Sequence, residues 1–118
     1  MTTKKYVETK DTVKTKFATQ SGPMLVIDGA IHQGFFPGST NYNIRNGVGI
    51  APDGRIILVI SNEPLNLHTF ARFFKDYFKC ENALYLDGAI SQTYIKDLGR
   101  MQGGGKFGPM IGVYKIVP

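Results

Sequence analysis

The sequence has little thiol or imidazole chemistry, with one cysteine, Cys80, and two histidines, His32 and His68. A single cysteine excludes an internal disulfide and leaves the redox compartment open. We interpret Cys80 as a small, partly buried residue and not as a reactive thiol, because no motif places a histidine beside it as a base. No Cys/His spacing matches a zinc site, so we expect neither a metal nor another cofactor.

Long apolar runs are also missing. No stretch reaches the roughly 20 apolar residues of a membrane-spanning helix, so we expect no membrane span. The first 16 residues are rich in Lys and Thr and have no apolar core of the kind found in signal peptides. Two interpretations of the compartment stay open, a cytoplasmic protein or a piece of a longer chain.

The formal charge is +5, and much of the excess lies at the start of the chain. Residues 1–16 contain five lysines against Glu8 and Asp11. Nucleic-acid-binding domains usually carry their basic residues on folded elements, interleaved with aromatics. We therefore expect no nucleic-acid partner, and we interpret residues 1–15 as a flexible, basic leader.

The chain nevertheless holds enough apolar material for one packed domain, which we place at residues 16–118. Hydrophobic residues make up 42% of the 118 residues, which excludes a disordered protein. Short apolar runs separated by Asp-Gly turns predict a series of strands. The predicted strands are 24–27, 30–32, 47–51, 55–61, 83–86, 92–95 and 110–117. Because 55–61 is apolar almost throughout, we expect it to be buried on both faces.

One helix is predicted, over about residues 67–78. Its apolar side chains recur at helical spacing, and Asn66 is the expected N-cap. The apolar face consists of Leu67, Phe70, Ala71, Phe74, Tyr77 and Phe78. Strands around one main helix predict an α+β fold, a mixed sheet of short strands packed on that helix. Residues 33–46 are predicted to form an exposed loop of the kind that often carries ligand contacts.

Two residues have both a structural and a functional interpretation. Asp87 belongs to an Asp-Gly turn, a pair that occurs three times here, but it also ends an apolar strand where catalytic groups often lie. Arg45 either covers surface or provides a two-pronged clamp for a phosphate. The segment GGGK at 103–106 does not satisfy the phosphate-loop pattern, because Arg100 and Phe107 occupy the positions where that pattern requires Gly and Ser/Thr.

Five segments in order resemble the phosphodiester glycosidase family, to which N-acetylglucosamine-1-phosphodiester α-N-acetylglucosaminidase belongs. They are SGPMLVIDGAIH (21–32), RNGVGIAPDGRI (45–56), NLHTFARFF (66–74), NALYLDGAIS (82–91) and GPMIGVYKI (108–116). The resemblance covers about residues 16–118 and corresponds to the C-terminal half of the family's domain. The domain is therefore expected to be incomplete on its N-terminal side.

The resemblance implies a hydrolase that cleaves a sugar from a sugar-1-phosphodiester or a related bacterial polysaccharide or glycoconjugate. It implies catalytic roles for Asp87 and Ser91. It also implies substrate binding by Arg45, Asn46, Gly88, His32 and Ser39. Family members are often exported, which bears on the compartment left open above.

Two further hypotheses come from other classes of protein. A truncated domain would bind sugar phosphates without catalysis, since glycoside cleavage generally uses two acid/base groups and Asp87 is the convincing one here. A structural fragment would instead pair with a partner chain, or with a second copy, through an exposed sheet edge.

Overall fold

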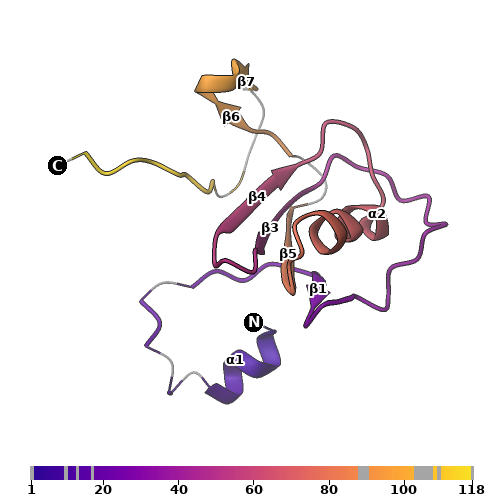
Figure 1. The fold of residues 1–118 in the computed structure, drawn as a ribbon, viewed down its shortest axis with the longest axis vertical. Coiled ribbons are helices and arrows are strands. Elements are labelled where there is room, and N and C mark those ends of the chain that lie inside the picture. Colours follow the sequence, from indigo (N-terminus) through magenta and orange to yellow (C-terminus); the bar gives the residue numbers. More distant parts are fainter. Residues whose placement is uncertain are drawn as a thin grey trace.

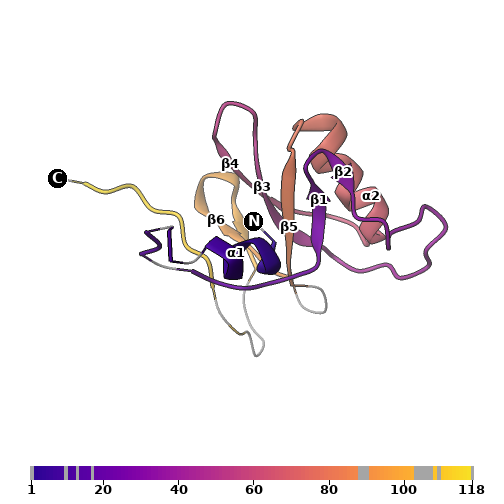
Figure 2. The same cartoon turned by 90° about the horizontal axis from the view of Figure 1, so that it is seen from below.

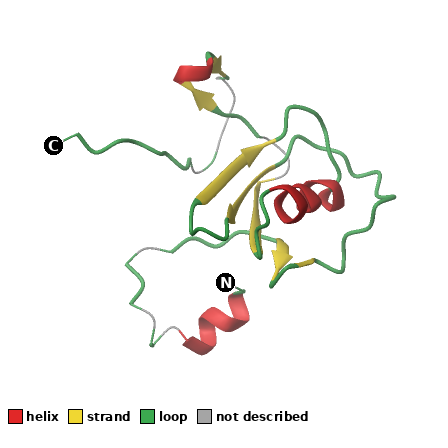
Figure 3. Cartoon of the chain, in the orientation of Figure 1, coloured by secondary structure: helices red, strands yellow, loops and turns green. Residues whose placement is uncertain are grey.

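The computed structural model describes residues 2–9, 11–12, 14–16, 18–87, 91–102, 108 and 110–117. Its helical elements are α1 (Thr3–Thr9), α2 (Leu67–Arg72), the π-helical turn η1 (Phe73–Tyr77) and the 3₁₀ turn η2 (Lys96–Leu98). Its strands are β1 (Met24–Ile27), β2 (Ala30–Ile31), β3 (Asn46–Ile50), β4 (Ile56–Ile60), β5 (Asn82–Asp87), β6 (Tyr94–Ile95) and β7 (Arg100–Met101). Figure 3 colours these elements by type.

Five strands form one sheet in the order β2-β1-β5-β3-β4, and each neighbouring pair is antiparallel. Helix α2 lies against one face of this sheet (Figures 1 and 2). Strands β6 and β7 form a separate two-stranded sheet. The predicted α+β class is confirmed.

Two predicted hairpins are present. Asp28 and Gly29 connect β1 to β2, and both have positive φ, which is the requirement of the tight turns that match strand twist. β3 and β4 pair from Asn46↔Ile60 to Ile50↔Ile56, around a turn in which Gly54 has a φ of 84°. Local turn chemistry therefore fixes both registers.

The main helix begins as predicted, because the Asn66 side chain accepts a hydrogen bond from the Thr69 backbone N–H at 2.8 Å. Phe70, Ala71 and Phe74 are buried against the sheet. The expected burial of Tyr77 is wrong, since this residue is 70% exposed. The last turn is π-helical, so the extra residue per turn rotates Tyr77 off the face that a 3.6-residue period predicts.

The core lies between this helix and the central strands. Its buried residues are Leu25, Val26, Phe70, Ala71, Phe74, Cys80, Ala83 and Tyr85. Burial raises the pKa of the Cys80 thiol, which keeps that group protonated. Cys80 is 1% exposed, so it is more deeply buried than the sequence predicts.

Two strand predictions are wrong. Segment 55–61 is not buried on both faces, because Ile56 is 70% exposed and Leu58 is 44% exposed. Only the other face of β4, with Ile57 and Val59, packs against the core. Residues 110–117 form no strand, and their side chains are exposed. A strand needs a neighbouring backbone edge, and no described segment pairs with this one.

Strand β7, which is not among the predicted strands, pairs with β6. At the other end, α1 lies in the expected leader, and residues 4–8 of this helix are exposed. None of the described helices has the length and apolar character needed to cross a membrane. The division into a leader and a domain stays a prediction.

Candidate active site

Three strand ends meet at one end of the sheet. Asn46 begins β3 and pairs with Ile60 at the end of β4 and with Asp87 at the end of β5. The register between β3 and β5 shifts between Asn46 and Gly47. Such irregularities re-aim side chains and are frequent beside active sites. These strand ends therefore form the candidate site.

Asn46, Asp87 and Ser91 are linked there by hydrogen bonds, and we call these three residues the strand-end cluster. The Asp87 backbone N–H donates to Asn46 Oδ1 at 3.1 Å, and Asn46 Nδ2 donates to Ser91 Oγ at 2.8 Å. The Ser91 hydroxyl in turn donates to the Ile44 carbonyl at 3.0 Å. Asn46 and Ser91 are half-buried, whereas Asp87 is exposed. Three of the predicted site residues are thus brought together.

Arg45 precedes Asn46 and is only 3% exposed. Its Nε donates to the Leu65 carbonyl at 3.0 Å, and its Nη1 donates to the Tyr85 hydroxyl at 2.7 Å. Its Nη2 donates to the carbonyl and side-chain oxygens of Asn41 at 2.8 and 2.9 Å. The guanidinium also lies 5.5 Å from the centre of the Tyr85 ring. The guanidinium of Arg45 therefore connects the loop at Asn41, the segment just before α2 at Leu65, and strand β5 at Tyr85.

Every one of these Arg45 partners is a neutral group. Within the described part of the chain, the two ion pairs are Arg55–Asp53 and Arg72–Asp76, and neither involves Arg45. Buried charges are normally paired, because removing a charge from water is costly. A buried guanidinium satisfied by neutral oxygens keeps its positive charge uncompensated, and that charge lies one residue from the strand-end cluster.

His32 and Ser39 lie outside the strand-end cluster. His32 Nδ1 accepts a hydrogen bond from the Gly34 N–H at 3.1 Å, and its ring lies 4.9 Å from that of Phe35. Ser39 lines a cavity of about 220 Å³, together with Asn41 and His68. Asn41 connects this cavity to Arg45 through the hydrogen bonds described above.

Gly88 lies outside the described residues. The segment GGGK at 103–106 also lies outside them. Among the residues that the structure describes, no three His, Cys, Asp or Glu side chains gather closely enough to hold a metal ion.

Sequence reasoning missed two residues that build the site. Tyr85 supplies the hydroxyl that Arg45 binds, and its signal was a phenol within an otherwise apolar strand. Arg100 donates from Nη1 to Asn62 Oδ1 at 2.6 Å, which ties the β6–β7 hairpin to the loop after β4. The pattern around Arg100 gave no indication of this contact, because the two residues are 38 positions apart.

Comparison with known proteins gives the family to which this chain belongs. The chain matches the phosphodiester glycosidase family over residues 2–114, and it belongs to that family. Its relatives include the uncharacterized protein YigE of Escherichia coli (strain K12), which is 40% identical over 87 residues. That alignment covers 74% of this chain and 34% of YigE, so the chain spans about a third of this relative's length. No solved structure gives a significant match.

Proposed function

We propose that this chain carries part of the active site of a hydrolase that removes a sugar from a sugar-1-phosphodiester. The bond cleaved joins the anomeric carbon to the phosphodiester oxygen. Related bacterial exopolysaccharides or glycoconjugates with the same linkage are the substrate class. Family membership supports the reaction type, and the geometry supports the position of the site.

The uncompensated charge of Arg45 carries the proposal. A phosphodiester brings a single negative charge to whichever site binds it, and a preorganised cation in a water-poor environment stabilises that charge more than one in water. Arg45 fulfils this role through the electric field of its charge, one residue along the chain from Asn46. It does so without releasing the hydrogen bonds that hold the surrounding loops.

The strand-end cluster supplies the groups that reach the sugar. Asp87 is exposed at the end of β5, where its carboxylate acts as an acid/base or orients the sugar hydroxyls. The Asn46 side chain links Asp87 to Ser91. Its amide oxygen accepts from the Asp87 backbone N–H, and its amide nitrogen donates to the Ser91 hydroxyl. Ser91 is then a hydrogen-bond partner to substrate, with its hydroxyl held by two protein contacts.

The role of the Arg45 charge can be tested by calorimetric titration with N-acetylglucosamine 1-phosphate. Arg45→Gln removes the charge, whereas Arg45→Lys keeps it and loses the fork. We expect Arg45→Gln to weaken binding about tenfold or more and Arg45→Lys to weaken it much less. Circular dichroism checks that both variants are folded. Equal binding by wild type and Arg45→Gln would show that the charge has no part in recognition.

A second candidate is binding without turnover. It is favoured by the strand-end cluster, in which Asp87 is the carboxylate, while glycoside cleavage generally uses two such groups. The chain also spans only about a third of YigE. Saturable binding of N-acetylglucosamine 1-phosphate with no release of sugar from a phosphodiester would establish this candidate and exclude the first for the chain alone.

A further inference from the structure

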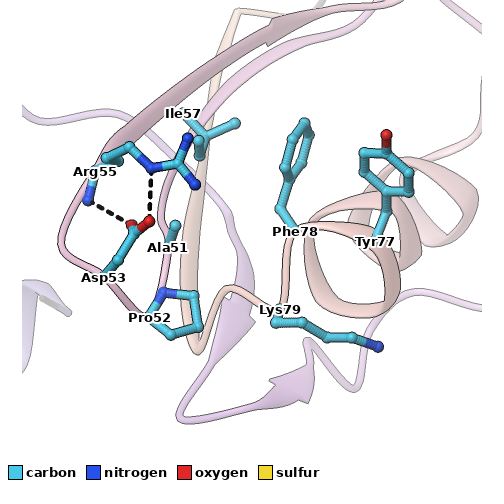
Figure 4. Close-up of a pocket in the computed structure, with 8 residues that line it drawn as sticks. All are labelled: Ala51, Pro52, Asp53, Arg55, Ile57, Tyr77, Phe78 and Lys79. Atoms are coloured by element: carbon cyan, nitrogen blue, oxygen red, sulfur yellow. Dashed lines mark hydrogen bonds and ion pairs between the residues drawn. The ribbon is translucent and has the colours of Figure 1, made fainter.

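A cavity of about 320 Å³ lies at the other end of β3 from the strand-end cluster (Figure 4). It opens between the β3–β4 turn and the end of η1. Because β3 runs from Asn46 to Ile50, roughly 13 Å of strand separates the two places. The volume is at the lower end of the range for small-molecule sites, which suits a ligand of one ring. We call it the turn cleft.

Two cations stand at the turn cleft. Asp53 is held within its own turn, because its carboxylate accepts from Arg55 Nε at 2.6 Å and from the Arg55 backbone N–H at 3.1 Å. These contacts hold the pKa of Asp53 below its usual value. Within the described residues, neither the terminal nitrogens of Arg55 nor Lys79 Nζ makes a hydrogen bond or ion pair. Charge at the cleft therefore favours an anion.

The opposite wall is aromatic and apolar. Phe78 and Ile57 face the space into which the Arg55 guanidinium is turned, and Tyr77 stands beside Phe78 (Figure 4). Tyr77 is 70% exposed and stacks on Phe73 with ring centres 5.2 Å apart and planes 5° from parallel. Phe78 packs edge-on against Tyr77 at 4.9 Å. Rigid aromatic side chains offer apolar contact at little entropic cost.

Lys79 occupies a position that glycine usually fills. It follows the helix end with a φ of 56°, in the left-handed region. This conformation is unfavourable for a residue with a Cβ. Strained residues cluster at ligand sites, where the strain places a side chain that the site uses. Here the strained residue lines the turn cleft, with its side chain extended away from Arg55 (Figure 4).

We propose that the turn cleft binds a single sugar ring bearing an anionic group, with the apolar face of the ring against Tyr77 and Phe78. The anion lies on Arg55, and the flexible Lys79 side chain turns toward it on binding. The anionic group is either a carboxylate, as in a uronic acid, or a phosphate. The proposal goes beyond the function proposed above, since the turn cleft shares no residue with the strand-end cluster and binds without chemistry. It gives the chain a second contact with an acidic glycan.

Titrations followed by ¹⁵N NMR test the proposal on the whole chain, with glucuronic acid and glucose 6-phosphate as probes. Glucose and inorganic phosphate serve as the neutral sugar and the bare anion. We expect shifts at the amides of Arg55, Phe78 and Lys79 with at least one anionic sugar, and about tenfold weaker binding of glucose and of inorganic phosphate. The tighter of the two anionic sugars identifies the anionic group.

Three variants and one control complete the test. Arg55→Gln and Lys79→Gly each remove a cation, the second while keeping the left-handed turn, and Tyr77→Ala removes the stacking ring. Each is expected to weaken binding about tenfold. Arg72→Gln changes an exposed arginine outside the cleft and is expected to bind as wild type. Absence of shifts at the cleft, equal binding of glucose, or shifts confined to Asn46 and Ser91 would overturn the proposal.

Discussion

At the scale of single residues, Arg45 shows how one side chain serves both folding and recognition. Its fork satisfies oxygens of Leu65, Tyr85 and Asn41, which come from three separate parts of the chain. The same burial leaves its charge without a carboxylate among the described residues. A lysine lacks the planar guanidinium needed for these contacts. Arginine therefore suits both the hydrogen bonds that hold the fold and the positive charge proposed for recognition.

Gly49 is a residue-scale constraint of a different kind. A Cβ at this position would lie 2.7 Å from Phe74 Cδ1 and 2.9 Å from Cys80 Sγ, both in the core. We expect Gly49→Ala to lower the free energy of unfolding by about 1–3 kcal/mol, because the core must shift to admit the methyl group. The measurement is the midpoint of urea unfolding.

Gly38→Ala is the matched control, since the nearest atom to its added Cβ is 3.9 Å away. We expect its midpoint to stay close to that of wild type. Equal midpoints for Gly49→Ala and Gly38→Ala would contradict the close packing of β3 on the helix.

At the scale of elements, the main helix was predictable because its signals are local. Asn66 has the chemistry of a cap, and the spacing of Phe70 and Phe74 is that of a buried face. The π-helical end was not predictable, since no residue pattern near Tyr77 indicates an extra residue in the last turn. The burial of β4 was also misjudged, because an apolar run does not say how many layers will cover it.

The cap itself gives an element-scale prediction. Asn66 is 2% exposed, accepts from Thr69 N–H, and donates to the carbonyls of Pro37 and Ser39 at 3.1 and 3.2 Å. We expect Asn66→Ala to lower the free energy of unfolding by about 2–4 kcal/mol, through the lost cap and the two carbonyls left without a donor. Thermal and urea unfolding both report this change.

Asn66→Ser separates the two contributions. Serine keeps a capping oxygen but does not reach the carbonyls, so its stability is expected to fall between those of wild type and Asn66→Ala. If Asn66→Ala were as stable as wild type, the amide would not be the link between the loop and the helix.

The candidate site shows the same division between local and long-range information. Asp87 and Asn46 were identified from a strand end and a motif, and the structure brings both to Ser91. Tyr85 was missed, because its role depends on an arginine 40 positions away. Roles for His32 and Ser39 stay predictions, since these residues lie apart from the strand-end cluster.

At the scale of the whole molecule, one face of the sheet has no covering layer among the described residues. Helix α2 covers the other face (Figure 2). Ile50, Ile56 and Leu58 are 56%, 70% and 44% exposed on β3 and β4. Exposed apolar patches of this kind usually mark surfaces that contact other polypeptide.

The open face predicts self-association of this chain on its own. We expect sedimentation velocity to show an average mass that rises with concentration, because two copies remove their apolar faces from water together. Ile56→Thr combined with Leu58→Thr keeps residues that suit strands and is expected to shift the chain toward monomer.

Leu98→Thr is the matched control, since Leu98 is 74% exposed on η2, outside the five-stranded sheet. It is expected to associate as wild type. A single monomeric species for wild type at every concentration would contradict self-association through the open face.

We propose that the strand-end cluster takes part in the cleavage of a sugar-1-phosphodiester. The most direct test is the rate of N-acetylglucosamine release from methyl N-acetylglucosamine 1-phosphodiester by wild type, Asp87→Asn and Asp28→Asn. Both substitutions remove one exposed carboxylate from an Asp-Gly sequence pair, but Asp28 lies at the far end of β1. We predict that Asp87→Asn lowers the rate about 100-fold or more and that Asp28→Asn leaves it unchanged. No release by wild type, or equal rates for all three proteins, would contradict the account.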